Sequence, residues 1–283
     1  MHKLCETAQE LSCKPVLVTF SPHTLMVVRP DIDVRCLTTL EEKLALTKRY
    51  GGITDNIVIN FTPAVVAMSA GEFMDSLTTN FTIRGIEVGS NFSLGHNRMG
   101  DISFLKEYGQ QHGIVVRTIS LEEGEGTRIS STRIRTLVSE GQVAEANELL
   151  GHPFTLTDVV RHGDHRGRLL GFPTANLKPG AHKLVPLNGV YAAYVSLENR
   201  ATGDATSASS VYKGVVNIGI RPTFGGKERI VEAYLLDVEP DLYDKRITID
   251  FIARLRNEQR FAGVDALKSQ IAADVQQARQ LLN

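Results

Sequence analysis

The stretch Arg246-Ile247-Thr248-Ile249-Asp250-Phe251-Ile252-Ala253-Arg254-Leu255 alternates between apolar and mostly polar side chains. A period of two is typical of a β-strand that buries one face and exposes the other. We therefore predict a strand here whose odd-numbered side chains face a core. Its outward face would carry Thr248, Asp250, Ile252 and Arg254.

Three segments upstream are further strand candidates, at residues 189–197, 211–218 and 230–238. Clusters of turn-forming residues at 201–204 and 224–227 separate them. Several short strands in succession predict an antiparallel β-barrel. An amphipathic helix then closes the chain. Its apolar positions are Val264, Leu267, Ile271, Val275 and Leu282.

The first half of the chain alternates strand-like and helix-like segments instead. Short apolar runs at 14–20, 56–60, 85–89 and 114–119 are typical of buried parallel strands. Helices are predicted at 39–50 and from 70 to about 78, where Ser69 and Glu72 can form a capping box. This order predicts an α/β domain with a parallel sheet, although a helix-like segment at 2–12 precedes the first strand. We place the domain boundary after a helix at 142–150, which gives domains 1–150 and 151–283.

Length and composition exclude several classes of protein. The 283 residues are 42% hydrophobic and 22% charged, with a net charge of −1, which argues against a disordered chain or a general nucleic-acid binder. The sequence has no apolar run of transmembrane length and no signal peptide at Met1, so we expect no membrane partner. Its three cysteines (Cys5, Cys13 and Cys36) fit neither a disulfide framework nor a metal cluster, which favours the cytoplasm.

The glycine-rich segment 162–176 carries the densest chemical signal. Its glycines allow close approach of the backbone to a ligand, and its arginines suit a phosphate. Thr174 and Asn176 offer neutral oxygen ligands of the kind that Mg²⁺ accepts. A tight turn with solvated arginines is the alternative for the loop alone, but the Pro-Thr-Ala-Asn ending favours a site. The candidate phosphate-binding residues are Gly163, Arg166, Gly167, Arg168, Gly171, Pro173, Thr174 and Asn176.

Glu232 lies in an otherwise apolar predicted strand, with Tyr234, Leu236 and Val238 expected on the same face. A carboxylate in that setting is paired, exposed at an edge or functional. The residues alone leave a rim carboxylate or ion pair and a catalytic base equally open.

Three segments of the first half are candidate ligand loops. Residues 19–23 end a strand in a Pro-His turn, and residues 89–95 follow another strand with glycine at both ends. At 129–135, hydroxyl side chains precede a helix whose first turns carry arginines, which can form an anion site. The alternatives are an ordinary turn for the first segment and an ordinary helix cap for the third.

The motifs of the second half resemble the riboflavin kinase module of bacterial FAD synthetases, the bifunctional riboflavin kinase/FMN adenylyltransferases. Besides segment 162–176, the matching segments are Gly189-Val190-Tyr191, Asn217-Ile218-Gly219-Ile220-Arg221-Pro222-Thr223-Phe224, 232–237 and Leu242-Tyr243-Asp244-Lys245, where the family has glycine at position 244. The resemblance implies that Thr174 and Asn176 bind Mg²⁺ and ATP phosphates, and that Glu232 takes the proton from riboflavin. It places Arg254, Arg256, Glu258 and Phe261 on the flavin side, where a solvated charged turn is an equally good interpretation.

The first half resembles the FMN adenylyltransferase module of the same family, a Rossmann-like nucleotidyltransferase fold with a parallel sheet. The motifs at 20–23, 89–95 and 130–135 carry this resemblance, with Ser93 and Leu94 as mild departures. The resemblance implies that His23 and Asn91 line a flavin–nucleotide cleft. It also implies that ATP phosphates are held by Ser130, Ser131, Thr132, Arg133 and Arg135.

One motif of that module is missing. The family has Gly-x-Phe-Asp-Gly-x-His-x-Gly-His on a first strand and turn, and this sequence begins within the helix that follows. We expect an absent central strand to leave sheet edges and apolar surface exposed. We also expect impaired adenylyl transfer, because the two histidines stabilise charge in that reaction. A start assigned too late explains the intact later motifs better than a shortened chain or a decayed module.

The sequence thus predicts an enzyme of FAD biosynthesis that binds ATP, Mg²⁺ and riboflavin or FMN, as a monomer or weak homo-oligomer. The main alternative is a non-catalytic flavin or nucleotide sensor, which the combination of Glu232 with Thr174 and Asn176 argues against.

Overall fold

The computed structural model describes residues 1–119, 123–124, 127–162, 167, 171–197, 210–223 and 226–283. The chain forms two compact units, Met1–Ile129 and Ser130–Asn283.

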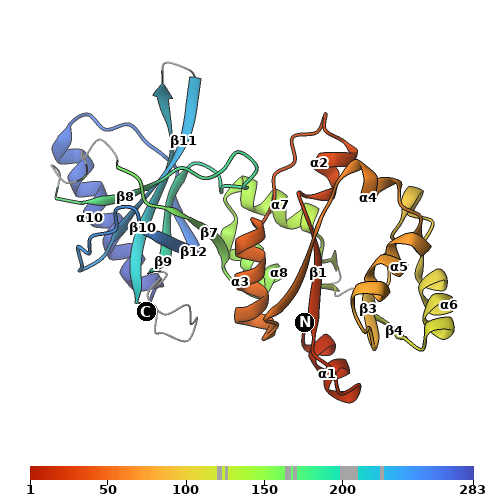
Figure 1. Cartoon of the computed structure of the whole chain (residues 1–283). Helices are drawn as coiled ribbons and strands as arrows, with labels where there is room; N and C mark the ends of the chain where they lie inside the picture. Colours follow the sequence, from red (N-terminus) through yellow and green to blue (C-terminus); the bar gives the residue numbers. More distant parts are fainter. Residues whose placement is uncertain (120–122, 125–126, 163–166, 168–170, 198–209, 224–225) are drawn as a thin grey trace. The chain divides into compact units, whose positions relative to one another are not determined.

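The first unit contains parallel strands, as predicted (Figure 1). Strand β1 (Val16–Ser21) pairs with β2 (Asp55–Asn60), and β3 (Gly85–Gly89) pairs with β4 (Val115–Ile119). These are two separate two-stranded sheets among the described residues. A short hairpin, β5 (Glu123–Gly124) with β6 (Thr127–Arg128), follows.

In the described part of this unit, six helices and a 3₁₀ turn surround these strands. The first helix, α1 (His2–Glu10), confirms the predicted opening helix. The predicted helices are α3 (Leu40–Gly51) and α5 (Ala70–Asn80), and Ser69 and Glu72 exchange both bonds of the predicted capping box. Sequence reasoning missed α2 (Thr24–Val28), α4 (Pro63–Ala67), η1 (His96–Arg98) and α6 (Ile102–His112).

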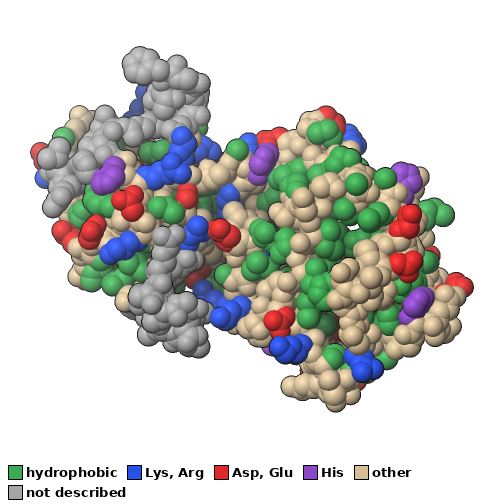
Figure 2. All heavy atoms as spheres, viewed as in Figure 1, with side chains coloured by type: hydrophobic (Ala, Val, Ile, Leu, Met, Phe, Trp, Pro, Cys, Tyr) green, Lys and Arg blue, Asp and Glu red, His purple; other side chains and the backbone are tan. Residues whose placement is uncertain are grey.

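The core of the first unit lies around α5 and α6, where Phe73, Met74 and Leu105 are buried. The paired strands leave apolar side chains at the surface. Val18, in the middle of β1, is 42% exposed, and Val58, in β2, is 41% exposed. Figure 2 shows hydrophobic side chains gathered on the surface of this unit.

The second unit is built on a six-stranded antiparallel sheet in the order β7-β12-β9-β10-β11-β8. The backbone N–H of Arg161, just beyond β7, donates to the carbonyl of Asn176 in β8 at 2.8 Å, so the two edges of the sheet meet. This arrangement confirms the predicted antiparallel barrel. The strands are β7 (Phe154–Val159), β8 (Thr174–Leu177), β9 (Gly189–Leu197), β10 (Val211–Thr223), β11 (Gly226–Leu235) and β12 (Arg246–Arg256).

Helices complete this unit. The predicted closing helix is α10 (Val264–Leu281), whose Val275, Ala278 and the following Leu282 pack on Val190 and Ala192 of β9. The helices α7 (Ser131–Glu140) and α8 (Val143–Leu150) belong to the same compact unit. The Asn147 amide of α8 donates to the Phe251 carbonyl at 2.8 Å and accepts from the backbone N–H of Phe154 at 2.7 Å. These bonds attach α8 to strands β12 and β7.

Some details of the strand predictions were wrong. The strand β10 continues to Thr223, and β11 begins at Gly226, so both exceed their predicted bounds at this end. The strand β11 ends at Leu235, three residues early, because Asp237 adopts a left-handed conformation with φ = 64°. Leu236 and Val238 therefore do not continue the face of Glu232. The carboxylate of Asp250 was placed outward, but it is buried and accepts from the Thr155 hydroxyl at 2.8 Å. The neighbouring strand β7, which the sequence did not reveal, covers it.

Candidate functional site

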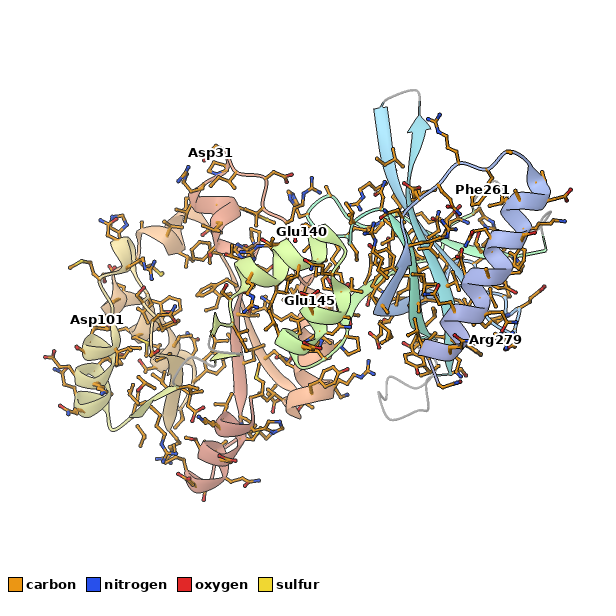
Figure 3. The ribbon with its side chains drawn as sticks, turned by 180° about the vertical axis from the view of Figure 1, so that it is seen from behind. Asp31, Asp101, Glu140, Glu145, Phe261 and Arg279 are labelled. Carbon is orange, nitrogen blue, oxygen red and sulfur yellow. The ribbon has the colours of Figure 1, made fainter. Side chains whose placement is uncertain are left out.

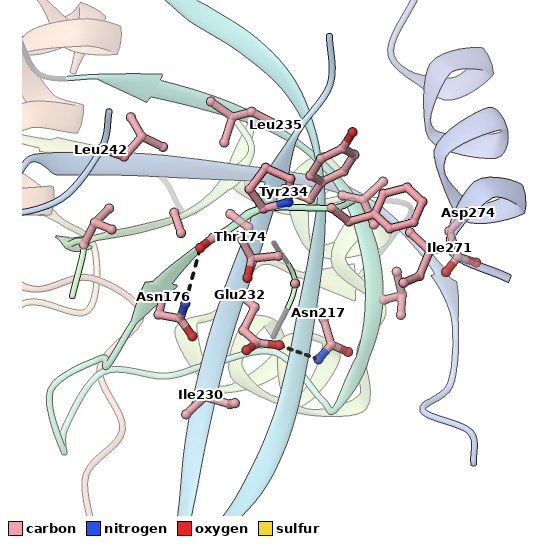
Figure 4. Close-up of a pocket in the computed structure, with 18 of the residues that line it drawn as sticks. Thr174, Asn176, Asn217, Ile230, Glu232, Tyr234, Leu235, Leu242, Ile271 and Asp274 are labelled. Atoms are coloured by element: carbon pink, nitrogen blue, oxygen red, sulfur yellow. Dashed lines mark hydrogen bonds between the residues drawn. The ribbon is translucent and has the colours of Figure 1, made fainter. Parts of the chain in front are cut away.

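A cavity of about 830 Å³ opens in the second unit. Its walls come from strands β8, β10 and β11, from the segments after β11 and β12, and from helix α10. Figure 4 shows side chains from these elements converging on it. Several of the predicted kinase residues line this cavity, namely Gly167, Pro173, Thr174, Asn176, Glu232, Arg256, Glu258 and Phe261.

A row of polar side chains crosses the wall of the cavity. The antiparallel register pairs Glu232 of β11 with Asn176 of β8 on one side and with Asn217 of β10 on the other. Residues paired in this way project from the same face of a sheet. The Asn217 amide Nδ2 lies 3.5 Å from Glu232 Oε2, and the Asn176 Nδ2 donates to the Thr174 carbonyl at 3.3 Å (Figure 4).

Asn217 was not among the predicted site residues. Asn217 is the first residue of the Asn-Ile-Gly motif, so the motif could have indicated it. The pairing of Asn217 with Glu232 depends on the register of the strands, which a sequence does not display. Glu232 itself is half-buried, so its carboxylate reaches the cavity from within the sheet.

Gly167 approaches Thr174 closely. A Cβ added at Gly167 would lie 2.5 Å from the carbonyl oxygen of Phe172 and 3.2 Å from the Thr174 hydroxyl oxygen. Only glycine fits there without displacing the backbone, because the nearest atom is a backbone oxygen. Gly167 therefore lies against the hydroxyl that the sequence predicts to be a ligand.

The remaining residues of the glycine segment are only partly described. Gly163, Arg166 and Arg168 lie outside the described residues. Gly171 has φ = 86°, a conformation that favours glycine. Phe172 packs its ring edge-on against Tyr234, with centroids 5.4 Å apart, and burial raises the pKa of Tyr234.

The flavin-side residues have different surroundings. The guanidinium of Arg256 makes a two-pronged ion pair with the buried carboxylate of Asp274, with Nε–Oδ1 at 2.9 Å and Nη2–Oδ2 at 2.7 Å. It also lies 5.8 Å from the Phe261 ring centroid. Figure 3 shows Phe261 just before helix α10. The ion pair between Arg256 and Asp274 therefore holds the segment 256–261 against this helix. Arg254 is not among the residues that line the cavity, and its Nη2 donates to the Asn188 carbonyl at 2.6 Å.

Glu258 is held from the sheet side. Its Oε2 accepts from the amide of Asn188 at 3.0 Å. A Cβ on Gly219 would lie 2.5 Å from its Oε1, so Glu258 occupies space that a side chain on β10 would otherwise take.

The candidate adenylyltransferase residues fall in both units. In the first unit, His23 follows β1 and caps α2, with its Nδ1 accepting from the backbone N–H of Leu25 at 3.2 Å. Asn91 is exposed and follows β3. Both therefore lie at carboxyl ends of parallel strands, the usual position for ligand loops.

In the second unit, Ser130 caps helix α7, and its hydroxyl accepts from the backbone N–H of Arg133 at 3.3 Å. The Arg135 guanidinium donates to the Thr132 hydroxyl at 3.3 Å. Arg133 Nη1 is shielded from solvent without a hydrogen-bond partner among the described residues. Ser131 is exposed at the first turn. A cationic helix N-terminus of this kind suits an anion.

Comparisons with known proteins identify both halves. Residues 1–133 match the FAD synthetase family model, and residues 150–282 match the riboflavin kinase family model. A bifunctional riboflavin kinase/FMN adenylyltransferase from Pseudomonas fluorescens is 35% identical over 99% of this chain and 87% of its own length. The protein of the same description from Escherichia coli K12 is 38% identical over 99% of this chain and 86% of its own. The chain belongs to the family of bifunctional riboflavin kinase/FMN adenylyltransferases.

A solved structure described as a macrolide-efflux protein from Streptococcus pneumoniae shares the fold. It is 27% identical, with a TM-score of 0.83, over 97% of this chain and 86% of that one. Among the residues described for the present chain, none of the helices has the length and apolar character needed to cross a bilayer.

The cavity residues fit a hard cation. No cluster of three or more His, Cys, Asp or Glu suited to a metal occurs in the described part of the chain. Mg²⁺, however, commonly uses one or two protein oxygens together with substrate phosphates and water. The Asn176 amide nitrogen is already bonded to the Thr174 carbonyl, which leaves its Oδ1 as an acceptor in the same row as the Glu232 carboxylate. The donor set therefore matches the predicted ligand type.

Proposed function

We propose that the second unit of this chain phosphorylates riboflavin, with ATP as donor, to give FMN and ADP. The observation that carries the proposal is the row of Asn176, Glu232 and Asn217 in one cavity wall, beside Thr174 and Gly167. The family assignment supports it, because the relatives described above are named for this activity.

Glu232 would accept the proton of the riboflavin 5′-hydroxyl while the oxygen of that hydroxyl attacks the γ-phosphorus of ATP. The oxygen–phosphorus bond to ADP then breaks, and ADP leaves with the electron pair. Such a reaction depends mainly on the position of the reactants and on charge neutralisation. Thr174 and Asn176 would hold Mg²⁺, which would neutralise charge on the phosphates. Gly167 would let backbone N–H groups approach those phosphates.

The flavin would occupy the side of the cavity formed by Arg256, Glu258 and Phe261. Arg256 would act there by holding the segment 256–261 against α10 through Asp274. The half-buried ring of Phe261 and the apolar side chains of Leu267 and Ile271 line this side of the cavity and suit an aromatic ring system.

FMN adenylyl transfer, from FMN and ATP to FAD and pyrophosphate, is the second activity proposed. In the first unit, His23 and Asn91 would bind the flavin or the nucleotide. In the second unit, residues 130–135 would bind phosphates at the N-terminus of α7. We further propose a cytoplasmic protein that acts on small molecules as a monomer or weak homo-oligomer, without a nucleic-acid partner.

Chromatography of flavins tests both activities at once. With riboflavin, ATP and Mg²⁺, the full chain should accumulate FMN and little FAD. Glu232→Gln should abolish FMN formation while riboflavin binding, measured by flavin fluorescence, persists. Absence of FMN from the unmodified chain would refute the kinase assignment. Abundant FAD would refute the expectation of weak adenylyl transfer.

A further inference from the structure

Asn217 occupies a special place in the polar row. The register continues beyond it to Val190 of β9, which is 3% exposed and apolar. On the other side of Glu232, the Asn176 amide nitrogen is engaged with the Thr174 carbonyl. Among the described residues, Asn217 is therefore the cross-strand neighbour whose amide hydrogens point at the Glu232 carboxylate.

The direction of the Asn217 side chain is fixed by its strand. Val216 and Ile218, its neighbours on β10, are fully buried in the barrel. Side chains alternate along a strand, so Asn217 must project from the opposite face, which is the face that lines the cavity. A change of rotamer can therefore turn the amide, but cannot remove it from the row.

A second carboxylate lies close to the same amide. The point where a Cβ of Gly219 would stand is 3.6 Å from Asn217 Nδ2 and 2.5 Å from Glu258 Oε1. Two carboxylates near one site repel each other. An amide beside a carboxylate can donate to it without adding charge.

We propose that Asn217 is a positioning residue for Glu232, and that its amide holds the carboxylate in the direction of the attacking hydroxyl. This inference rests on the proposed function, because it concerns the base of the proposed reaction. Hydrogen bonds in apo sites are often long and shorten when substrates bind, which fits the 3.5 Å separation.

The test is steady-state kinetics of Asn217→Ala and Asn217→Asp in the full chain. Loss of a hydrogen bond to a charged group predicts a fall in kcat of about tenfold for Asn217→Ala. The KM values for riboflavin and for Mg·ATP should stay within about twofold, because the amide acts on the base and not on binding. Asn217→Asp, which keeps the side-chain shape, should lose at least as much, since it replaces a donor by a like charge.

Two further variants separate positioning from a structural role. Lys213→Met, on the same strand but outside the cavity, should leave kcat unchanged. Glu232→Asp retracts the carboxylate by one methylene, beyond reach of the amide, so adding Asn217→Ala to it should cause no further loss. A tenfold loss in that background would overturn the proposal, as would an unchanged kcat in Asn217→Ala. If the unmodified chain forms no FMN, the proposed function fails instead, so the two failures are distinguishable.

Discussion

The buried ion pair between Arg256 and Asp274 allows a quantitative prediction. The Asp274 side chain is 3% exposed and that of Arg256 is 20% exposed. Asp274 accepts three hydrogen bonds from this guanidinium and one from Gln270. In Asp274→Asn one acceptor oxygen becomes an NH₂ group that faces the donors of the Arg256 guanidinium. Hydrogen bonds from Arg256 are therefore lost, and its positive charge stays largely buried without a counter-charge.

The expected cost lies between two limits. Removal of one partner from a fully buried ion pair costs about 3–5 kcal/mol, and an exposed pair contributes about 0–1 kcal/mol. Because Arg256 retains some contact with solvent, we expect Asp274→Asn to lower the free energy of unfolding by about 2 kcal/mol. In a unit of this size, that corresponds to a fall in Tm of roughly 4–8 °C.

Calorimetric melting of the full chain measures this shift, and helix α10 supplies a matched control. Arg279 and Asp237 form a two-pronged pair at 2.9 and 2.6 Å, but it is exposed, and Figure 3 shows Arg279 at the other end of α10 from Phe261. Asp237→Asn should therefore leave Tm nearly unchanged. The KM for riboflavin should rise in Asp274→Asn, because the segment that carries Phe261 loses its anchor. Equal melting of the two variants would refute the reasoning from burial.

Three shorter predictions follow from other contacts. Gly167→Ala should raise the KM for Mg·ATP at least tenfold in the kinase assay, because its Cβ would meet the Phe172 carbonyl at 2.5 Å; an unchanged KM would remove this contact from the site. Asp244→Gly should raise the free energy of unfolding by about 0.5 kcal/mol in urea titrations, because Asp244 has φ = 58°; a loss of stability would contradict the strain argument. Burial raises the pKa of Tyr191 above its unfolded value of 10.0, so the folded state keeps the proton longer and stability falls as the pH rises beyond 10. Tyr191→Phe should flatten this alkaline loss in pH-dependent melting, and an equally steep loss would assign it to other groups.

Local patterns were sufficient for many elements. The strand β9 was predicted at its observed bounds, and the capping box of Ser69 and Glu72 has both of its bonds. These features depend on side chains a few residues apart, so the sequence displays them directly. The strand β8 was missed because it is short and continues a glycine-rich segment, which hides its alternation. The strand β7 was missed although Phe154 and Leu156 alternate with Thr155 and Thr157.

Some residues of the site were also recognisable from local patterns, and others only from the structure. Thr174, Asn176 and Glu232 were recognisable because they lie in motifs, and the structure brings them to one cavity. Asp274 and Asn217 were not predicted, since their roles arise from contacts with Arg256 and Glu232 across helix and strand. Arg254 carries the same charge as Arg256, but it bonds to the Asn188 carbonyl and does not line the cavity.

The sequence by itself determined the two kinds of domain, the chemical types of the candidate ligands and the family resemblance. Periodicity and motif spacing are local properties, so they can be recognised in the sequence alone. Only the tertiary structure decided that Asn176, Glu232 and Asn217 form one row, because that row depends on the register of three strands. A shift of one residue in either pairing would turn Glu232 and its neighbours to opposite faces.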